Sequence, residues 1–155
     1  MSDWKPYLRN PFPQPFDDDR ARLERLAGAA LPDAYWRTVV LYQGDVLDTE
    51  FELQGQRGTI NFGVLLLALS PQSVEQERSS YCVEYCFESM QDRYPEGLFP
   101  FADDTGGNYW AFDFRTNATN PAIVFIDHEM LGDEGVTPAS DSFTAFMAWA
   151  AAPGF

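Results

Sequence analysis

The chain has 155 residues, the length of one ordinary domain, and its 45% hydrophobic and 15% aromatic content excludes a disordered protein. Twenty-four acidic residues against ten basic ones give a formal net charge of -14. This balance argues against binding to nucleic acid or anionic lipid and favours basic partners, although ordinary solubility also explains it. The longest apolar run, residues 64–69, is too short to span a bilayer, and the start lacks a secretory signal. We therefore expect a cytoplasmic protein without membrane association.

The first half of the chain begins with an arm and two helices. Residues 1–16 contain four prolines among aromatic residues, which predicts an extended arm that either packs on the body or serves as a handle for a partner. Residues 17–155 read as one domain. Three aspartates at 17–19 predict a helix start, and apolar residues at helical spacing predict two helical pieces within 18–43, broken near "ALPD".

Alternation predicts a strand in "VLDTEFEL", residues 46–53. One face of this strand carries three acids, Asp48, Glu50 and Glu52, which is unusual because like charges along a strand repel one another. After a "GQRG" turn, residues 59–69 predict a strand that is apolar on both faces at one end.

A helix is expected over residues 74–93, and it contains both cysteines of the chain, Cys82 and Cys86. Their spacing does not suit a disulfide framework, and two ligands do not make a zinc site. The two residues are therefore predicted to be buried free thiols.

Three strands and a helix are expected in the second half. The strands are "LFPFA", "NYWAFDF" and "AIVFID", the last of which is apolar on both faces and therefore central. Residues 128–140 are predicted to form an acidic loop, and a helix capped by Ser140 or Ser142 closes the chain. Strands in neighbouring hairpins between helices predict an α+β fold with a mostly antiparallel sheet. The expected core includes Phe101, Trp110, Phe112 and Phe125.

The stretch "DDTGG", residues 103–107, raises the question of a catalytic or phosphate-binding loop. A phosphate loop needs a following helix N-terminus, whereas an aromatic alternating strand follows here, and the two acids would repel an anion. Gly106 and Gly107 permit positive φ, so a turn between two strands is the better interpretation.

The single histidine, His128 in "IDHE", has no nucleophile or metal-binding pattern to accompany it. A hydrolase that uses Asp127, His128 and Glu129 is one hypothesis, and a strand-end histidine held by a hydrogen bond is the favoured one. We expect neither an enzyme nor a cofactor or metal site.

Four stretches in order resemble the SUKH superfamily of Smi/Knr-like domains. These are "LPDAYWRTVVLYQGD", "LFPFADDTGGNYWAFDF", "AIVFIDHE" and "SDSFTAFMAWA", which together span about residues 31 to 150. The resemblance implies a strongly bent antiparallel sheet with helices packed on it. It also implies a non-catalytic protein-binding module, because bacterial members are widely immunity proteins that neutralise toxins and eukaryotic relatives act as interaction scaffolds.

The family turn usually carries Gly-Asp before the aromatic strand, whereas Asn108 follows Gly107 here. The short polar turn is retained and the negative charge is not, which puts in doubt any partner contact that uses that charge.

The favoured hypothesis is an immunity protein that binds a basic cognate toxin, such as a nuclease domain, and the alternative is an intracellular scaffold without a toxin partner. The expected partner-binding residues are all acidic: Asp48, Glu50, Glu52, Asp103, Asp104 and Glu129.

Overall fold

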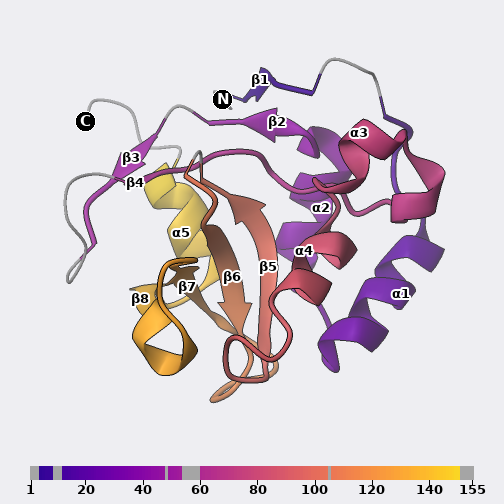
Figure 1. Cartoon of the computed structure of the whole chain (residues 1–155). Coiled ribbons are helices and arrows are strands. Elements are labelled where there is room, and N and C mark those ends of the chain that lie inside the picture. The colour runs from indigo at the N-terminus through magenta and orange to yellow at the C-terminus, as the bar shows by residue number, and fades with distance from the viewer. Residues whose placement is uncertain (1–3, 9–11, 48, 54–59, 105, 151–155) are drawn as a thin grey trace.

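Four antiparallel strands form the main sheet of the computed structural model, which describes residues 4–8, 12–47, 49–53, 60–104 and 106–150 (Figure 1). The strands are β5 (Leu98–Asp103), β6 (Tyr109–Asp113), β7 (Ala122–Ile126) and β8 (Val136–Ser140). They lie in the order β5-β6-β7-β8, so each pairs with its neighbour in sequence and β7 is central, as predicted. Register shifts within β5 and β7 mark irregularities of the kind that bend a strand. The predicted α+β class is confirmed.

Two short antiparallel pairs accompany this sheet. In one, β1 (Lys5–Pro6) pairs with β2 (Asp45–Val46), and in the other β3 (Glu50–Phe51) pairs with β4 (Ile60–Asn61). Near the first pair, the Trp4 ring stacks on the Tyr42 ring, so this part of the arm packs on the domain. The predicted "GQRG" turn lies outside the described residues.

The long strand predicted over residues 59–69 is wrong in its continuity. Beyond β4, only single bridges occur, such as Leu65 with Ala102. The backbone N–H groups of this segment donate to several different partners, including the carbonyl of Asp45 for Leu65 and that of Phe101 for Leu66. The segment is buried almost throughout, and its backbone groups bond to several elements in turn. It therefore runs through the core and does not extend one sheet.

The two helices expected within 18–43 are present as α1 (Asp17–Ala27) and α2 (Asp33–Tyr42). The carboxylate of Asp19 accepts the Phe16 N–H at 2.9 Å at the start of α1. Gly28 ends this helix in the left-handed region with φ 70°, which a residue without Cβ adopts readily.

The single helix predicted over residues 74–93 is wrong. The chain forms a 3-10 turn, η1 (Pro71–Ser73), and then two short helices, α3 (Gln76–Ser79) and α4 (Val83–Ser89). The break falls at Cys82, which is extended because the backbone on both sides of it bonds to Leu67: Leu67 donates to Tyr81, and Val83 donates to Leu67. These tertiary hydrogen bonds override the local helical pattern.

The acidic loop predicted over residues 128–140 is also wrong, because it contains a 3-10 turn, η2 (Gly132–Gly135), and the strand β8. This strand lies at the edge of the sheet and carries Pro138, which is tolerated where no further strand pairs. Its residues are only partly buried, so it lacks the hydrophobic alternation that reveals a strand in sequence.

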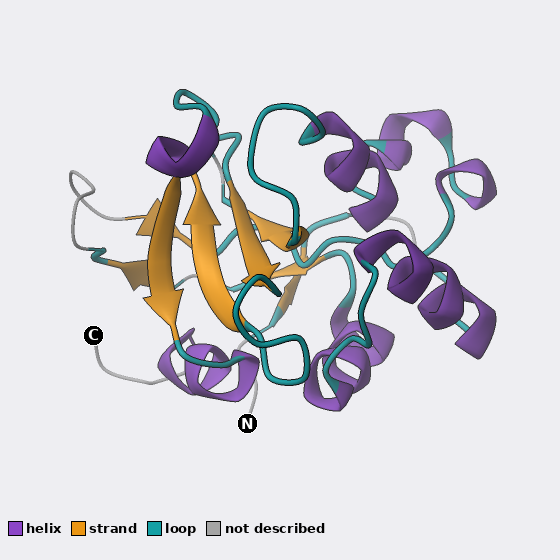
Figure 2. Cartoon of the chain, turned by 90° about the horizontal axis from the view of Figure 1, so that it is seen from below, coloured by secondary structure: helices purple, strands orange, loops and turns teal. Residues whose placement is uncertain are grey.

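The main core lies between one face of the sheet and the helices α2 and α5 (Phe143–Ala150), which Figure 2 shows on the same side, opposite η2. Tyr35 of α2 meets Phe112 edge to face at 5.2 Å between ring centroids. The predicted core residues are buried, with at most 1% of each exposed: Phe101, Trp110, Phe112 and Phe125. A smaller cluster covers the other face with Met90, Leu98, Ala111, Val124 and Ile126.

Candidate partner-binding face

The β5–β6 connection is a turn whose backbone N–H groups are satisfied by a carboxylate of the chain itself. Asp104 Oδ1 accepts the backbone N–H groups of Gly106 and Asn108 at 2.8 Å each, and Oδ2 accepts from the Asn108 side-chain amide at 2.9 Å. Of the two glycines, only Gly107 has positive φ, at 88°. The predicted turn is confirmed, and Asp104, only 8% exposed, occupies the position that an anion would take in a phosphate loop.

This turn is tied to the end of β7 through Asn108 and His128. Asn108 Oδ1 accepts the backbone N–H of His128 at 2.8 Å and lies 2.6 Å from its ring Nδ1. The Asp127 carboxylate accepts the Glu129 N–H at 2.9 Å, so it closes a local turn and does not orient the imidazole. The arrangement is that of a histidine held by a hydrogen bond, as favoured from the sequence.

Asp103, at the end of β5, is a half-buried carboxyl group in an unusual position. Its Oδ1 accepts the Val64 N–H at 2.6 Å, and its backbone carbonyl accepts the Gly63 N–H at 2.7 Å. Burial raises its pKa to about 7; the Val64 hydrogen bond opposes this shift, and the charge of Asp104 adds to it. A Cβ at Gly63 would lie 2.8 Å from the Asp103 carbonyl, so only glycine fits against this strand end.

Two tyrosines lie near this carboxyl group, and sequence reasoning did not assign them to the site: Tyr109 pairs with Asp103 between β5 and β6, and the Asp103 charge acts on Tyr81. Tyr7 and Tyr85 are 52% and 47% exposed, and the rings of Tyr7 and Tyr81 lie 6.3 Å apart. Burial raises the pKa of Tyr81 and of Tyr109, and the negative charge of Asp103 contributes to both shifts. Tyr81 lies directly before the break at Cys82, which the local sequence did not predict, and Tyr85 lies in α4.

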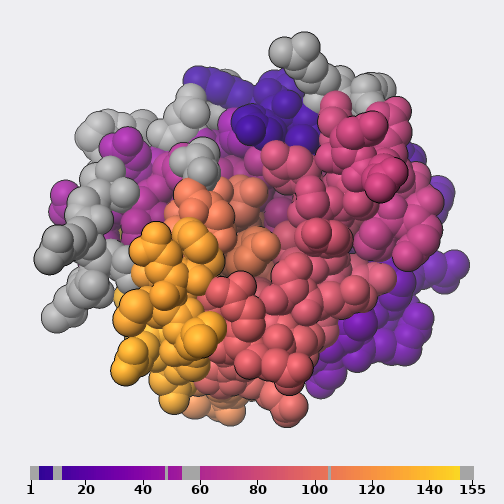
Figure 3. Space-filling model, viewed as in Figure 1, coloured from indigo at the N-terminus to yellow at the C-terminus, as the bar shows by residue number. Residues whose placement is uncertain are grey.

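Figure 3 shows this side of the molecule, where three segments far apart in the sequence meet at the surface. The orange tip of the β5–β6 hairpin lies between the pink α3–α4 segment and the gold segment that follows β7. The structure therefore brings Asp103 and Asp104 close to the segment that carries the exposed Glu129, through the Asn108–His128 contact.

The other predicted acids lie on the separate β3–β4 pair. Glu50 and Glu52 are exposed while Phe51 and Leu53 are buried, so the alternation expected for this segment is confirmed although the strand is short. Asp48 lies outside the described residues. The β3–β4 pair adjoins the end of β5 through the segment after β4, where the Gly63 N–H donates to the Asp103 carbonyl.

A profile of the SMI1 / KNR4 family (SUKH-1) matches residues 17–149, which is most of the chain. The chain belongs to this family. SUKH-1 domains are generally non-catalytic proteins of the immunity type and are associated with toxin partners, so membership is consistent with a toxin-immunity role. Comparisons with curated proteins and with solved structures gave no significant match.

Three further features of this SUKH-1 domain bear on the expectations from the sequence: its cysteines, possible metal ligands and possible membrane-spanning helices. Cys82 and Cys86 are buried free thiols, as predicted, and burial raises the pKa of each to about 12. No group of three or more His, Cys, Asp or Glu side chains among the described residues is placed to hold a metal ion. No helix in the same residues has the length and apolar character needed to cross a bilayer.

Proposed function

We propose that this protein is a cytoplasmic immunity protein that binds a basic cognate toxin, such as a nuclease domain, and neutralises it without catalysis. Membership of the SUKH-1 family carries the proposal, because the family is associated with toxin partners. The net charge of -14 supports the basic character of the partner, since a strongly acidic surface attracts cationic proteins and raises their association rate.

The proposed contact face combines acids with aromatic anchors. Glu129 and the Asp103 end of β5 would supply the carboxyl groups of this face, and the exposed rings of Tyr7 and Tyr85 would supply its aromatic surface. Tyrosines are enriched among the residues that dominate binding energy at interfaces. Both carboxylate oxygens of Asp104 accept hydrogen bonds within the turn, so we assign this residue an electrostatic role and no direct contact with the partner.

The acids of the β3–β4 pair form the second part of the proposed face, with Glu50 and Glu52 exposed and Asp48 as a further member. These charges act mainly on the rate of encounter, because exposed acids at the rim of an interface steer a basic partner more than they hold it. The division into an arm, residues 1–16, and a domain, residues 17–155, remains a prediction.

The test is an affinity capture from the cells that encode the protein, at low and at high salt. We expect one basic toxin-like domain that is lost as the salt concentration rises. The triple variant Glu50→Gln/Glu52→Gln/Glu129→Gln should bind it at low salt with an association rate about tenfold lower. The matched control Asp17→Asn/Asp18→Asn/Asp141→Asn removes the same number of exposed charges from α1 and from the connection before α5, and it should bind as the wild type does.

Two outcomes would contradict the proposal. Capture of several unrelated proteins and no toxin would favour the interaction scaffold. Equal association rates for the triple variant and its control would contradict the assignment of these residues to the binding face. The net charge of the whole molecule, and not these three acids, would then set the association rate.

A further inference from the structure

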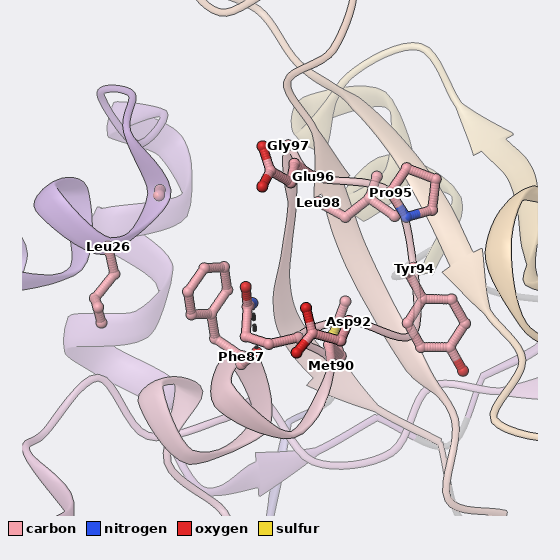
Figure 4. Close-up of a pocket in the computed structure, with 11 residues that line it drawn as sticks. Leu26, Phe87, Met90, Asp92, Tyr94, Pro95, Glu96, Gly97 and Leu98 are labelled. Atoms are coloured by element: carbon pink, nitrogen blue, oxygen red, sulfur yellow. Dashed lines mark hydrogen bonds between the residues drawn. The ribbon is translucent and has the colours of Figure 1, made fainter.

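A cavity of about 350 Å³ lies at the end of the molecule opposite the β5–β6 turn. Its apolar wall comes from Leu26 on α1, from Phe87 on α4, and from Met90 and Leu98 on either side of the connection between α4 and β5 (Figure 4). The Phe87 ring packs 5.3 Å from the Phe99 ring, so the core holds it in place. The cavity therefore has a preformed apolar wall.

Two carboxylates complete the lining, from the exposed residues Asp92 and Glu96. Neither forms an ion pair within the described part of the chain. Asp92 has φ 66°, which makes it the one non-glycine residue with positive φ among those described. Aspartate tolerates this region better than most residues, yet glycine would adopt it without strain, so the position holds a carboxylate where the backbone alone favours glycine.

Two of the nearby basic side chains are engaged elsewhere, whereas Arg25, which precedes Leu26 on α1, is exposed. Arg93 donates to the His128 carbonyl at 2.8 Å, and Arg115 pairs with Asp113 and Asp133. The cavity thus offers an aromatic and aliphatic wall beside two carboxylates that take part in none of the ion pairs among the described residues.

We propose that this cavity receives an arginine side chain of a protein partner. The methylene stem would lie along Leu26 and Phe87, and the guanidinium would face Asp92 and Glu96. A guanidinium is weakly hydrated, stacks on aromatic rings and pairs with carboxylates through a planar fork, so this mixture of surfaces suits it better than a compact ammonium. The inference rests on the proposed function only in taking a protein as the source of the arginine.

The test uses Nα-acetyl-arginine amide as the probe and follows backbone amide shifts of the ¹⁵N-labelled full chain at constant ionic strength. We expect saturable shifts at residues 26–27 and 87–98. The neutral isostere Nα-acetyl-citrulline amide should bind about tenfold more weakly, as expected for the loss of charge-assisted hydrogen bonds.

The variant Asp92→Asn/Glu96→Gln should weaken acetyl-arginine binding by a similar factor, since asparagine keeps the tolerance for positive φ and removes the charge. Its control, Glu75→Gln/Glu77→Gln, removes two exposed acids that do not line the cavity and should bind as the wild type does. The amide spectrum itself reports whether each variant is folded.

Equal binding of the arginine and citrulline probes would overturn the inference. So would changes in amide chemical shift that occur equally at acidic residues throughout the chain and are not confined to the cavity. The two proposals fail separately. Loss of acetyl-arginine binding would leave salt-sensitive toxin capture through Glu50, Glu52 and Glu129 intact, and failure to capture a toxin would leave binding of the probe to the cavity intact.

Discussion

At the residue scale, Asp103 combines a structural and an electrostatic role. Its carboxylate accepts the Val64 N–H, yet burial raises its pKa to about 7, against an ordinary value of 3.8. Between these two values the folded state binds a proton that the unfolded state has released. Raising the pH through this window therefore favours unfolding, and the contribution of Asp103 to stability is lost as pH approaches and passes 7.

We expect Asp103→Asn to remove this part of the pH dependence. Asparagine keeps an oxygen that accepts the Val64 N–H and cannot ionise, so the variant should gain stability relative to the wild type as pH rises from 3.8 to 7. The slope of the difference is at most about 1.4 kcal/mol per pH unit, the value for one proton. Urea unfolding across this range measures it, and parallel stability curves for the two proteins would contradict the assignment.

At the scale of the element, the β5–β6 turn explains the departure from the family's usual Gly-Asp. The Asn108 amide donates to Asp104, and its carbonyl oxygen accepts from His128. An aspartate at this position could make only the second contact and would place a second carboxylate against Asp104. In this chain, therefore, the asparagine supplies the donor that the Asp104 carboxylate needs and avoids a second negative charge beside it.

Asn108→Asp should destabilise the folded protein by about 1–3 kcal/mol at neutral pH, because a donor is lost and two like charges meet. Asp104→Asn supplies a new amide donor that faces the carboxylate introduced by Asn108→Asp. The double variant should consequently be more stable than the sum of the two single effects, by about 1–2 kcal/mol. A double-mutant cycle by chemical denaturation measures this coupling, and additive effects would show that the two side chains do not interact.

The elements themselves divide into those that local patterns predicted and those they did not. The helices α1 and α2 and the strands β5, β6 and β7 follow from apolar periodicity, because each buries one continuous face or both. The break at Cys82 depends on hydrogen bonds to Leu67, fifteen residues earlier, and the strand β8 depends on an exposed edge of β7. The local sequence at Cys82 or at β8 indicates neither the contact with Leu67 nor the exposed edge of β7.

At the scale of the whole molecule, the excess of acids opposes the compact state. Fourteen net negative charges repel one another in the folded protein more than in the expanded chain. The described ion pairs, such as those of Arg22 with Asp19 and Glu84, offset only part of this repulsion.

Added sodium chloride should therefore raise the melting temperature at neutral pH, since salt screens the repulsion over about 10 Å at 0.1 M. The rise should be much smaller near the isoelectric point of about 4.2, where the net charge is close to zero. Calorimetry at two salt concentrations and two pH values checks both statements. A melting temperature that falls with salt at neutral pH would mean that attractive ion pairs outweigh the net repulsion.

The candidate site illustrates why sequence alone locates acids but not a surface. The sequence identified the polar turn and the alternation that leaves Glu50 and Glu52 exposed. It did not identify the two tyrosines near Asp103, Tyr81 between α3 and α4 and Tyr109 on β6, or the contact of Tyr81 with Tyr7 of the arm.

By itself, the sequence determined the α+β class, the aromatic core, the acidic character and the family, because periodicity, composition and ordered motifs are local properties. Only the tertiary structure decided that Asp104 is used within the turn and that Asp92 and Glu96 line a cavity. The physical reason is that burial and proximity arise when segments distant in sequence pack together, and no local pattern records which segments those are.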